Sequence, residues 1–248
     1  EQMNWLAGMD RGLDQLLTLR CQAITSLTYP DDPPHYEVLL GVRSADGQVM
    51  PPAAFIDAAE HHKRMAQVDC WVVNALLDWM EANPEKMTTI AGFSINLSGN
   101  SVTDDQVLEY ILAQLTRRQI DSRKLCFEIT ETSAISSLAT ANDFISEVKR
   151  FGCQFSLDDF GTGLSSYAYL QKLDVNFLKI DGIFIRNIVH NTKDQALVSS
   201  IVELAQFMGL KTIAEFVEDA EVNDYVKALG VDKGQGYFLG KPTLLENL

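Results

Sequence analysis

Phe155-Ser-Leu-Asp158-Asp159-Phe160-Gly161-Thr162-Gly163 is the stretch of sequence that decides the fold. An apolar strand ends in two adjacent aspartates, a glycine-punctuated loop follows, and hydroxyl residues then open a helix. Two like charges a few ångströms apart raise each other's pKa, so paired aspartates are a poor choice for a core. A divalent cation between them would explain the pair, because carboxylate oxygens hold hard cations. The alternative is a polar strand-to-helix turn with an N-cap.

Apolar runs of strand length alternate with amphipathic helical runs along the chain, as a parallel α/β sheet requires. The expected strands span residues 21–27, 36–43, 91–97, 125–130, 153–157, 176–180, 211–214 and 233–236. The expected helices follow Pro51-Pro52 and span residues 65–82, 103–118, 138–151, 165–172, 194–208 and 219–229. Only a short turn-rich link separates the first two strands, so they must be antiparallel, because a parallel pair needs a crossover of about a dozen residues. We therefore expect an α/β, TIM-like (β/α)8 barrel whose first strand runs antiparallel to the others.

Size and composition fit one domain of this kind. The chain has 248 residues, 46% of them hydrophobic, and a (β/α)8 barrel usually needs about 250 residues. With no linker-like stretch and no internal repeat, residues 1–248 are expected to form a single domain. No apolar run approaches the roughly 20 residues of a membrane-spanning helix, and the first residues have no signal-peptide pattern. They do not resemble a natural N-terminus either, so we expect a domain excised from a larger multidomain signalling protein.

Charge and cysteine content narrow the function classes. The net charge of −14 argues against binding of long nucleic acid, which needs a basic surface. A small phosphate-bearing ligand remains compatible with this charge, since bound metal ions reverse the local field. The four cysteines are widely spaced without a CxxC pair. They fit reduced thiols in a cytoplasmic protein better than a disulfide framework or a zinc site.

Polar side chains interrupt the apolar runs near the carboxyl ends of the expected strands, where (β/α)8 enzymes carry their active sites. A buried carboxylate without a partner costs several kcal/mol, so a ring of them is sustainable only if all converge on cations. Taken singly, Asn96 or Gln235 is more simply a structural hydrogen-bonding residue. As a set, these residues predict a metal site: Glu37, Asn96, Glu128, Glu131, Asp158, Asp159, Lys179, Asp181, Glu215, Glu218 and Gln235.

Seven motifs within this set also carry a family resemblance. They are Glu37-Val-Leu-Leu, Asn96-Leu-Ser, Phe127-Glu-Ile-Thr-Glu131, Asp158-Asp-Phe-Gly-Thr-Gly163, Leu178-Lys-Ile-Asp181, Ala214-Glu-Phe-Val-Glu218 and Gln235-Gly-Tyr. In their order and spacing, the chain resembles the EAL domain family, the cyclic di-GMP phosphodiesterases of bacterial signalling, over essentially its whole length. The Glu-Ala-Leu signature of the family reads Glu37-Val38-Leu39 here, which keeps a small apolar residue in the middle.

The resemblance implies metal-dependent hydrolysis of cyclic di-GMP to linear pGpG, with Mg²⁺ or Mn²⁺ in a two-metal site. The metal ligands that it implies are Glu37, Asn96, Glu128, Asp158, Asp159 and Glu215. The catalytic set that it implies is Glu37, Lys179, Glu215 and Glu131, the last of which would brace the loop that follows Asp159. The substrate-binding residues expected with it are Gln22, Leu39, Arg43, Asp181, Glu218 and Gln235.

One departure concerns an arginine that the family usually carries four residues after the signature glutamate, where it contacts a ligand phosphate. Gly41 occupies that position here, and losing a charge-assisted contact costs roughly 1.5–3 kcal/mol. Strand alternation places Arg43 on the same face, so we hypothesise that Arg43 partly replaces the contact; alternatively it is a solvated rim residue. Under this hypothesis Gly41→Arg tightens binding of cyclic di-GMP. Smaller departures are Phe216, where the family often has glycine, and Lys233, expected near the end of the last strand.

The alternative function is a catalytically weak or inactive receptor that binds cyclic di-GMP and relays a signal. Such receptors typically lose metal ligands, whereas this chain keeps the full set, which favours catalysis. A module that binds neither nucleotide nor metal would show random losses among the acids. As partners we expect cyclic di-GMP, a second copy in a homodimer, and an adjacent sensor or GGDEF-type domain in the parent chain. We expect no direct membrane contact from this segment, and a cytoplasmic location.

Overall fold

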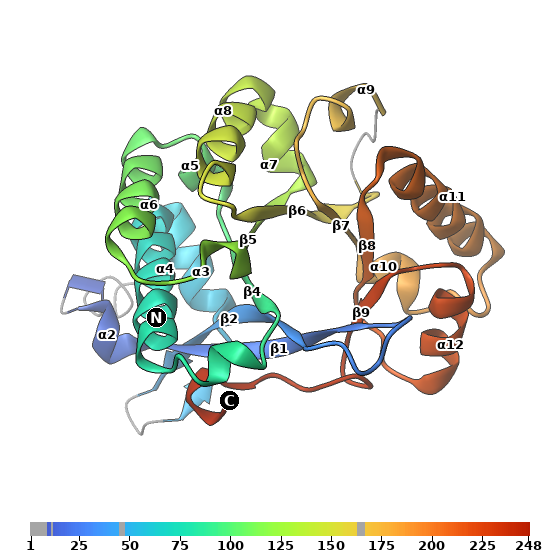
Figure 1. Ribbon diagram of the computed structural model, residues 1–248, viewed down its shortest axis with the longest axis horizontal. Helices are drawn as coiled ribbons and strands as arrows, with labels where there is room; N and C mark the ends of the chain where they lie inside the picture. Colours follow the sequence, from blue (N-terminus) through green and yellow to red (C-terminus); the bar gives the residue numbers. More distant parts are fainter. Residues whose placement is uncertain (1–8, 11, 45–47, 163–166) are drawn as a thin grey trace.

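A closed barrel forms the centre of the computed structural model (Figure 1). The structure describes residues 9–10, 12–44, 48–162 and 167–248. The strands are β1 (Leu17–Ser26), β2 (His35–Arg43), β3 (Val49–Met50), β4 (Gly92–Asn96), β5 (Leu125–Thr130), β6 (Gln154–Phe160), β7 (Phe177–Ile180), β8 (Lys211–Ala214), β9 (Lys233–Gln235) and β10 (Thr243–Leu244). Within these residues, eight strands follow the order β1-β9-β8-β7-β6-β5-β4-β2, and β2 pairs back to β1. Strands β3 and β10 pair with β2 and β1 outside the ring.

Strand β1 runs against the rest of the barrel, which confirms the predicted fold. It is antiparallel to β2 and to β9, whereas the pairs from β2 through β4, β5, β6, β7 and β8 to β9 are all parallel. The β1–β2 register sets Gln22 opposite Glu37 and Arg20 opposite Leu39. Residues opposite each other on paired strands have side chains on the same face of the sheet. This register therefore decides which β1 side chains stand beside Glu37.

Helices cover the outside of the barrel (Figure 1). They are α2 (Leu13–Leu16), α3 (Ala53–His61), α4 (Met65–Ala82), α5 (Gly99–Val102), α6 (Asp105–Arg117), α7 (Glu131–Ser136), α8 (Leu138–Lys149), α9 (Tyr167–Leu170), α10 (Gly182–Ile185), α11 (Thr192–Met208) and α12 (Ala220–Ala228). Three 3₁₀ turns are η1 (Lys86–Thr88), η2 (Ser122–Lys124) and η3 (Leu245–Asn247). In α4 the buried residues Val68, Val72 and Leu76 recur at helical spacing and form the stripe that faces the strands.

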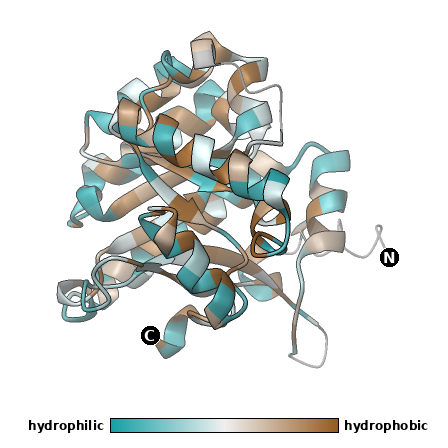
Figure 2. Ribbon diagram, turned by 90° about the vertical axis from the view of Figure 1, so that its right-hand side faces the viewer, coloured by the Kyte–Doolittle hydropathy of each residue, from teal (hydrophilic) through white to brown (hydrophobic). Residues whose placement is uncertain are grey.

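Hydrophobic side chains fill the layer between the strands and the helices. Figure 2 shows the hydrophobic ribbon segments gathered on the central strands, with hydrophilic segments on the surrounding helices and loops. Three fully buried phenylalanines on neighbouring strands, Phe93, Phe127 and Phe155, belong to this layer. Trp79 of α4 meets Phe93 edge-on with ring centroids 5.6 Å apart, and Phe144 of α8 meets Phe155 at 6.3 Å. Aromatic pairs at such separations stabilise beyond the area that they bury.

The barrel interior is polar toward the carboxyl ends of the strands. In β5, Phe127 and Ile129 belong to the layer beneath the helices, so the intervening Glu128 points inward, because successive strand side chains alternate between faces. Glu37, Glu128 and Lys179 are all buried in this interior. Burying such groups is costly unless they pair with one another. We therefore expect the lysine and the two glutamates to be in contact.

The observed strand and helix bounds differ from the predicted ones in two informative places. The sequence predicts that the fifth strand ends at Leu157, but β6 continues to Phe160, and its register with β7 shifts between Leu157 and Phe160. Such a bulge re-aims side chains, and it includes the aspartate pair. The helix predicted over 165–172 begins partly outside the described residues, and α9 covers Tyr167–Leu170. None of the helices in the described ranges is long and apolar enough to cross a membrane.

Candidate active site

Four carboxylates surround one buried lysine at the carboxyl end of the barrel. Glu37 comes from β2, Glu128 from β5, Asp158 from β6 and Lys179 from β7, and Glu215 directly follows β8. Lys179 Nζ lies 2.8 Å from Glu128 Oε2 and 3.0 Å from Glu215 Oε1. It lies 3.3 Å from both Glu37 Oε2 and Asp158 Oδ1. The structure thus brings together five predicted site residues that lie far apart in the sequence.

A chain of side-chain amides orients the carboxylate of Glu37. Asn96 Nδ2 donates to Glu37 Oε1, and Gln235 Nε2 donates to Glu37 Oε2, both at 2.6 Å. Gln235 Nε2 also lies 3.2 Å from Gln22 Oε1, and Gln22 Nε2 donates to the Gly240 carbonyl at 2.9 Å. Hydrogen bonds to a charged group are among the stronger ones in proteins. Strands β1, β4 and β9 therefore cooperate to hold this β2 side chain in one orientation.

Burial and charge separate the protonation behaviour of these acids. Burial raises the pKa of the Glu128 carboxyl to about 8 and that of Glu215 to about 7, against the attraction of Lys179. Burial acts in the same direction on Glu37, but Lys179, Gln235 and Asn96 outweigh it and hold the Glu37 pKa below its usual range. Burial disfavours the charge of Lys179, yet the surrounding carboxylates raise its pKa well above the usual value. The lysine is therefore a permanent cation within a cluster that has more acids than one lysine can neutralise.

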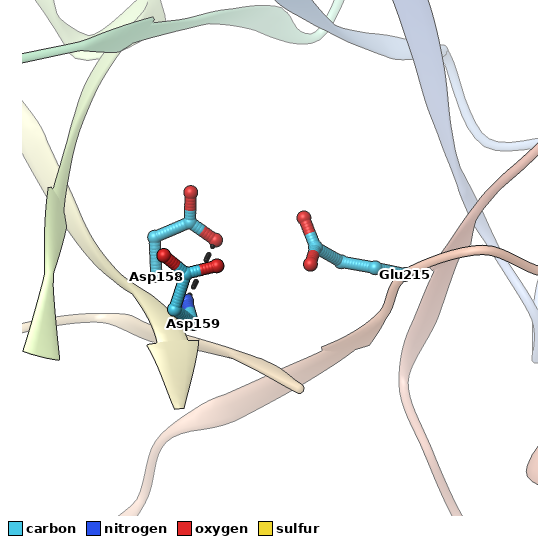
Figure 3. Close-up of side chains that lie close together, drawn as sticks. All are labelled: Asp158, Asp159 and Glu215. Carbon is cyan, nitrogen blue, oxygen red and sulfur yellow. Dashed lines mark hydrogen bonds between the residues drawn. The ribbon is translucent and has the colours of Figure 1, made fainter. Parts of the chain in front are cut away.

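The donor set of this cluster suits a divalent cation. Carboxylate oxygens of Asp158, Asp159 and Glu215 lie within 4.8 Å of one another, and Figure 3 shows the two aspartates facing Glu215 across a gap. Glu128 Oε1 is buried and receives no hydrogen bond from any residue within the described ranges. An unpaired buried carboxylate oxygen is costly, and hard cations take carboxylate and amide oxygens as ligands. An excess of acids with one unsatisfied oxygen is what a metal-binding cluster requires.

The adjacent residue Asp159 has an unusual backbone conformation. Its φ is +54°, in the left-handed region that aspartate tolerates better than most residues. Burial, and then the charges of Asp158 and Asp181, raise the pKa of the Asp159 carboxyl. Strained conformations of this kind concentrate at functional sites. The bulge in β6 and the positive φ together turn the two consecutive aspartates toward the same gap.

Glu131 lies behind the aspartate pair and holds the segment that follows it. Its Oε2 accepts the Gly161 N–H at 3.0 Å, and its Oε1 accepts a short hydrogen bond from the Tyr169 hydroxyl. The side chain is fully buried. Glu131 therefore ties α7 to the end of β6 and to α9, which agrees with the bracing position that the family resemblance implies.

A cavity of about 240 Å³ opens beside the acid cluster. The residues that line it are Gln22, Glu37, Leu39, Glu215, Phe216, Glu218, Gln235, Gly236 and Tyr237. Of the expected substrate-binding residues, it includes Gln22, Leu39, Glu218 and Gln235. Asp181 contributes differently, because its Oδ1 caps α10 by accepting the Ile183 N–H at 2.8 Å.

Arg43 does not line this cavity. Its Nη2 donates to Thr18 Oγ1 at 3.2 Å, and the residue borders a second hollow together with Trp71 and Trp79 of α4. Gly41 is tightly enclosed, because a Cβ there would lie 2.8 Å from Val49 Cγ1 and 3.0 Å from Thr18 Cγ2. The structure therefore makes Gly41→Arg a sterically demanding replacement, so a simple gain in affinity no longer follows from it.

Lys233 lies at the start of the last strand and not near its end, where the sequence predicted it. It begins β9, whereas Gln235 ends that strand, and its Nζ stands 5.4 Å from the ring centroid of Phe177 at the start of β7. The prediction was wrong because β9 has only three residues and begins at Lys233, so Gln235, two positions later, occupies the carboxyl end of the strand.

Phe216 and Tyr237 form an aromatic rim that the sequence did not assign to the site. Phe216 has a φ of +54°, a backbone conformation that glycine adopts without steric cost. Its ring packs on Gly182, where a Cβ would come within 2.0 Å of Phe216 Cδ2, and the Arg186 guanidinium lies 4.0 Å from the ring centroid. Both aromatic side chains are exposed, at 42% for Phe216 and 60% for Tyr237. Exposed aromatic residues beside a cavity are suited to contact a flat ligand.

Fold and site together define a class: (β/α)8-barrel proteins with a cluster of carboxylates around a buried lysine at the carboxyl ends of their strands. A family-wide sequence profile described as the EAL domain matches residues 13–242. The chain therefore belongs to the EAL domain family, as its motifs suggested.

Two relatives named as cyclic di-GMP phosphodiesterases support this membership. Cyclic di-GMP phosphodiesterase PdeB of Shewanella oneidensis is 39% identical over 226 residues, which cover 91% of this chain and 26% of that protein. Cyclic di-GMP phosphodiesterase PdeF of Escherichia coli is 37% identical over 208 residues, which cover 84% of this chain and 28% of that protein. The chain thus spans about a quarter of the length of these relatives.

Solved structures agree with the sequence matches. The structure named PaMucR phosphodiesterase in complex with c-di-GMP superposes with a TM-score of 0.90 at 28% identity, covering 98% of this chain and 99% of that one. The FimX EAL domain of Pseudomonas aeruginosa bound to c-di-GMP superposes with a TM-score of 0.88 at 27% identity, covering 96% of each chain.

Proposed function

We propose that this domain hydrolyses cyclic di-GMP to linear pGpG with Mg²⁺ or Mn²⁺ bound at a two-metal site. The observation that carries the proposal is the cluster of carboxylates around buried Lys179 at the edge of an open cavity. We infer the substrate from the family: the chain belongs to the EAL domain family, and its relatives include named cyclic di-GMP phosphodiesterases.

The metal ligands in this proposal come from the cluster and its immediate neighbours. Glu37, Asn96, Glu128 and Asp158 would hold one ion, and Asp159 with Asp158 would hold the other. When bound, such a pair supplies an activated water and neutralises charge on the phosphate during in-line displacement. The unpaired Glu128 oxygen and the close approach of the Asp158, Asp159 and Glu215 carboxylates support this assignment.

Two further residues act on water and on developing charge. Glu215 lies at the edge of the cavity, where its carboxylate can accept a proton or a hydrogen bond from an attacking water. Lys179 supplies a fixed positive charge where negative charge develops on the phosphate. Its four carboxylate partners prevent it from moving toward solvent. The exposed rim around Leu39, Phe216 and Glu218 is left to contact the rest of the dinucleotide.

The first test is conversion of cyclic di-GMP to pGpG, followed chromatographically with the purified domain and Mg²⁺ or Mn²⁺. Glu37→Ala is expected to abolish conversion, because it removes a metal ligand that two amides orient. Glu203→Gln is the matched control, since it removes an exposed acid from α11, far from the cavity. Binding of cyclic di-GMP without turnover would instead identify a receptor, and neither binding nor turnover would overturn the proposed function.

We also propose that the domain acts within a longer cytoplasmic chain. The relatives are about three to four times as long as the matched region, and one of them, MucR, is named a bifunctional diguanylate cyclase and cyclic di-GMP phosphodiesterase. An adjacent sensor or GGDEF-type domain and assembly as a homodimer belong to this proposal. Light scattering of the full-length chain with and without cyclic di-GMP tests the dimer, and a mass of one chain under both conditions would refute it.

A further inference from the structure

Arg20 is a half-buried cation on the strand that borders the cavity. It lies on β1 two residues from Gln22 and opposite Leu39 of β2. Both of those residues line the cavity. Strand alternation and cross-strand pairing put the side chains of Arg20, Gln22 and Leu39 on one face. Because β1 runs antiparallel to β2, Arg20 stands nearer the open end of the barrel than Gln22 does.

The guanidinium of Arg20 makes one hydrogen bond to the backbone and has further N–H donors that could bind a ligand. Its Nη2 donates to the Pro242 carbonyl at 3.2 Å, next to the Gly240 carbonyl that fixes Gln22. Among the residues that the structure describes, no carboxylate pairs with it. A guanidinium has five N–H donors in a rigid fork, which matches the oxygens of a phosphate. An arginine without an acidic partner, in a protein of net charge −14, has the chemistry of an anion-binding group.

Gly41 provides the room that the Arg20 side chain needs. A Cβ at position 41 would lie 3.4 Å from Arg20 Cδ, in addition to its closer approaches to Val49 and Thr18. The Arg20 stem therefore passes over the glycine. A larger residue at position 41 would crowd it. Gly41 stands where the family usually has an arginine, and its lack of a side chain leaves room for a different arginine, Arg20.

Three other cations near the cavity have partners among the residues that the structure describes. Lys179 is enclosed by four carboxylates, Arg186 stacks on Phe216 at 4.0 Å, and Lys241 lies 5.7 Å from the Tyr237 ring centroid. A cyclic dinucleotide carries two phosphodiesters, and only one of them can lie at the metal ligands during cleavage. The second needs a separate cationic contact at the rim.

We propose that Arg20 binds the phosphate of cyclic di-GMP that is not being cleaved. This assignment rests on the proposed function and names a binding residue that the family motifs do not include. It replaces the hypothesis that Arg43 supplies the contact, because Arg20 stands opposite Leu39, which lines the cavity, whereas Arg43 lies four positions beyond Leu39 along β2 and borders a different hollow.

The test compares two phosphodiester substrates in the same variants. Cyclic di-GMP carries the second phosphate, whereas bis(4-nitrophenyl) phosphate has a single one. For Arg20→Gln we expect KM for cyclic di-GMP to rise roughly 10- to 100-fold, the size of a lost charge-assisted contact. The loss in kcat/KM is expected to be at least about tenfold larger for cyclic di-GMP than for the small diester. Arg20→Lys should fall between, because it keeps the charge without the fork.

Three outcomes decide the inference. Equal losses on both substrates would show that Arg20 merely supports the segment around Pro242, and would overturn the proposal. A larger rise in KM for Arg43→Gln than for Arg20→Gln would overturn it in favour of the sequence-based hypothesis. Arg150→Gln, which changes an exposed arginine at the C-terminal end of α8 that pairs with Glu147, controls for the change in net charge. If the wild-type domain neither binds nor cleaves cyclic di-GMP, the proposed function fails instead.

Discussion

At the scale of single residues, Lys179 tests how a buried network of charges contributes to stability. It is fully buried and meets four carboxylates within 3.3 Å. Removing one partner of a buried charge network leaves the others uncompensated, which costs about 3–5 kcal/mol. We therefore expect Lys179→Met to lower the free energy of unfolding of the metal-free domain by about that amount at pH 8, measured by urea denaturation. Lys193→Met, on the exposed face of α11, should change it little. Equal stabilities of the two variants would contradict this account.

Phe216 offers a test of backbone strain that is independent of catalysis. Its left-handed φ of +54° costs a residue with a Cβ about 1–2 kcal/mol relative to glycine. Phe216→Gly should therefore be more stable than Phe216→Ala by about 1 kcal/mol in thermal or urea unfolding. Phe207, exposed within α11, is the matched position, because there glycine should be less stable than alanine by a similar amount. The same order at both positions would argue against strain at Phe216.

Residue types and their strand-end spacing were enough to predict most of the acid cluster. A carboxylate between large apolar neighbours, such as Glu128 between Phe127 and Ile129, marks an inward position in a barrel strand. Arg20 could not be predicted in the same way. Its place beside the cavity depends on the β1–β2 register, which sequence spacing alone does not determine. The sequence indicates that Phe216 departs from a glycine that is common in the family. It does not predict the positive φ of Phe216, which explains that glycine, because backbone conformation there depends on the fold around β8.

At the scale of elements, β6 and the segments that brace it set the geometry of the aspartate pair. Glu131 of α7 holds Gly161 and Tyr169, so its effect reaches Asp159 through the backbone. Residues that orient metal ligands typically change affinity by about 10–100-fold when they are lost. Glu131→Ala should raise the dissociation constant for Mn²⁺ by at least tenfold, measured from the electron paramagnetic resonance signal of the free ion. Tyr169→Phe should give a smaller increase, since it leaves the contact between Glu131 and the Gly161 N–H in place. Unchanged Mn²⁺ affinity in Glu131→Ala would show that the brace does not act on the metals.

The order of elements was more predictable than their ends. Alternating apolar and amphipathic runs gave the barrel, and the short link before Tyr36 gave the reversed first strand. The end of β6 was misjudged, because two consecutive aspartates followed by a glycine-containing segment resemble a loop in sequence. A cluster that stabilises them inside the barrel allows the strand to continue to Phe160.

For the whole molecule, the raised pKa values of Glu128 and Glu215 make stability depend on pH when no metal is bound. Their folded pKa values of about 8 and 7 exceed the ordinary value of 4.5. The folded state therefore holds more protons than the unfolded state between those limits, so stability falls as pH rises from about 5 to 8. Each group contributes at most about 1.4 kcal/mol per pH unit. Urea denaturation at pH 5.5 and 8 in EDTA should show this loss, and saturating Mg²⁺ should reduce it, because the cation replaces the protons. Equal slopes with and without Mg²⁺ would contradict it.

The central claim is that the carboxylate cluster holds the divalent ions with which the domain cleaves cyclic di-GMP. The most direct measurement is the initial rate of pGpG formation against Mn²⁺ concentration, recorded beside the number of Mn²⁺ ions bound per chain. We predict no turnover in EDTA, a rate that rises as the second ion binds, and in Glu37→Ala the loss of turnover together with at least one of the bound ions. Turnover that persists in EDTA, or metal binding that Glu37→Ala leaves intact, would contradict the account.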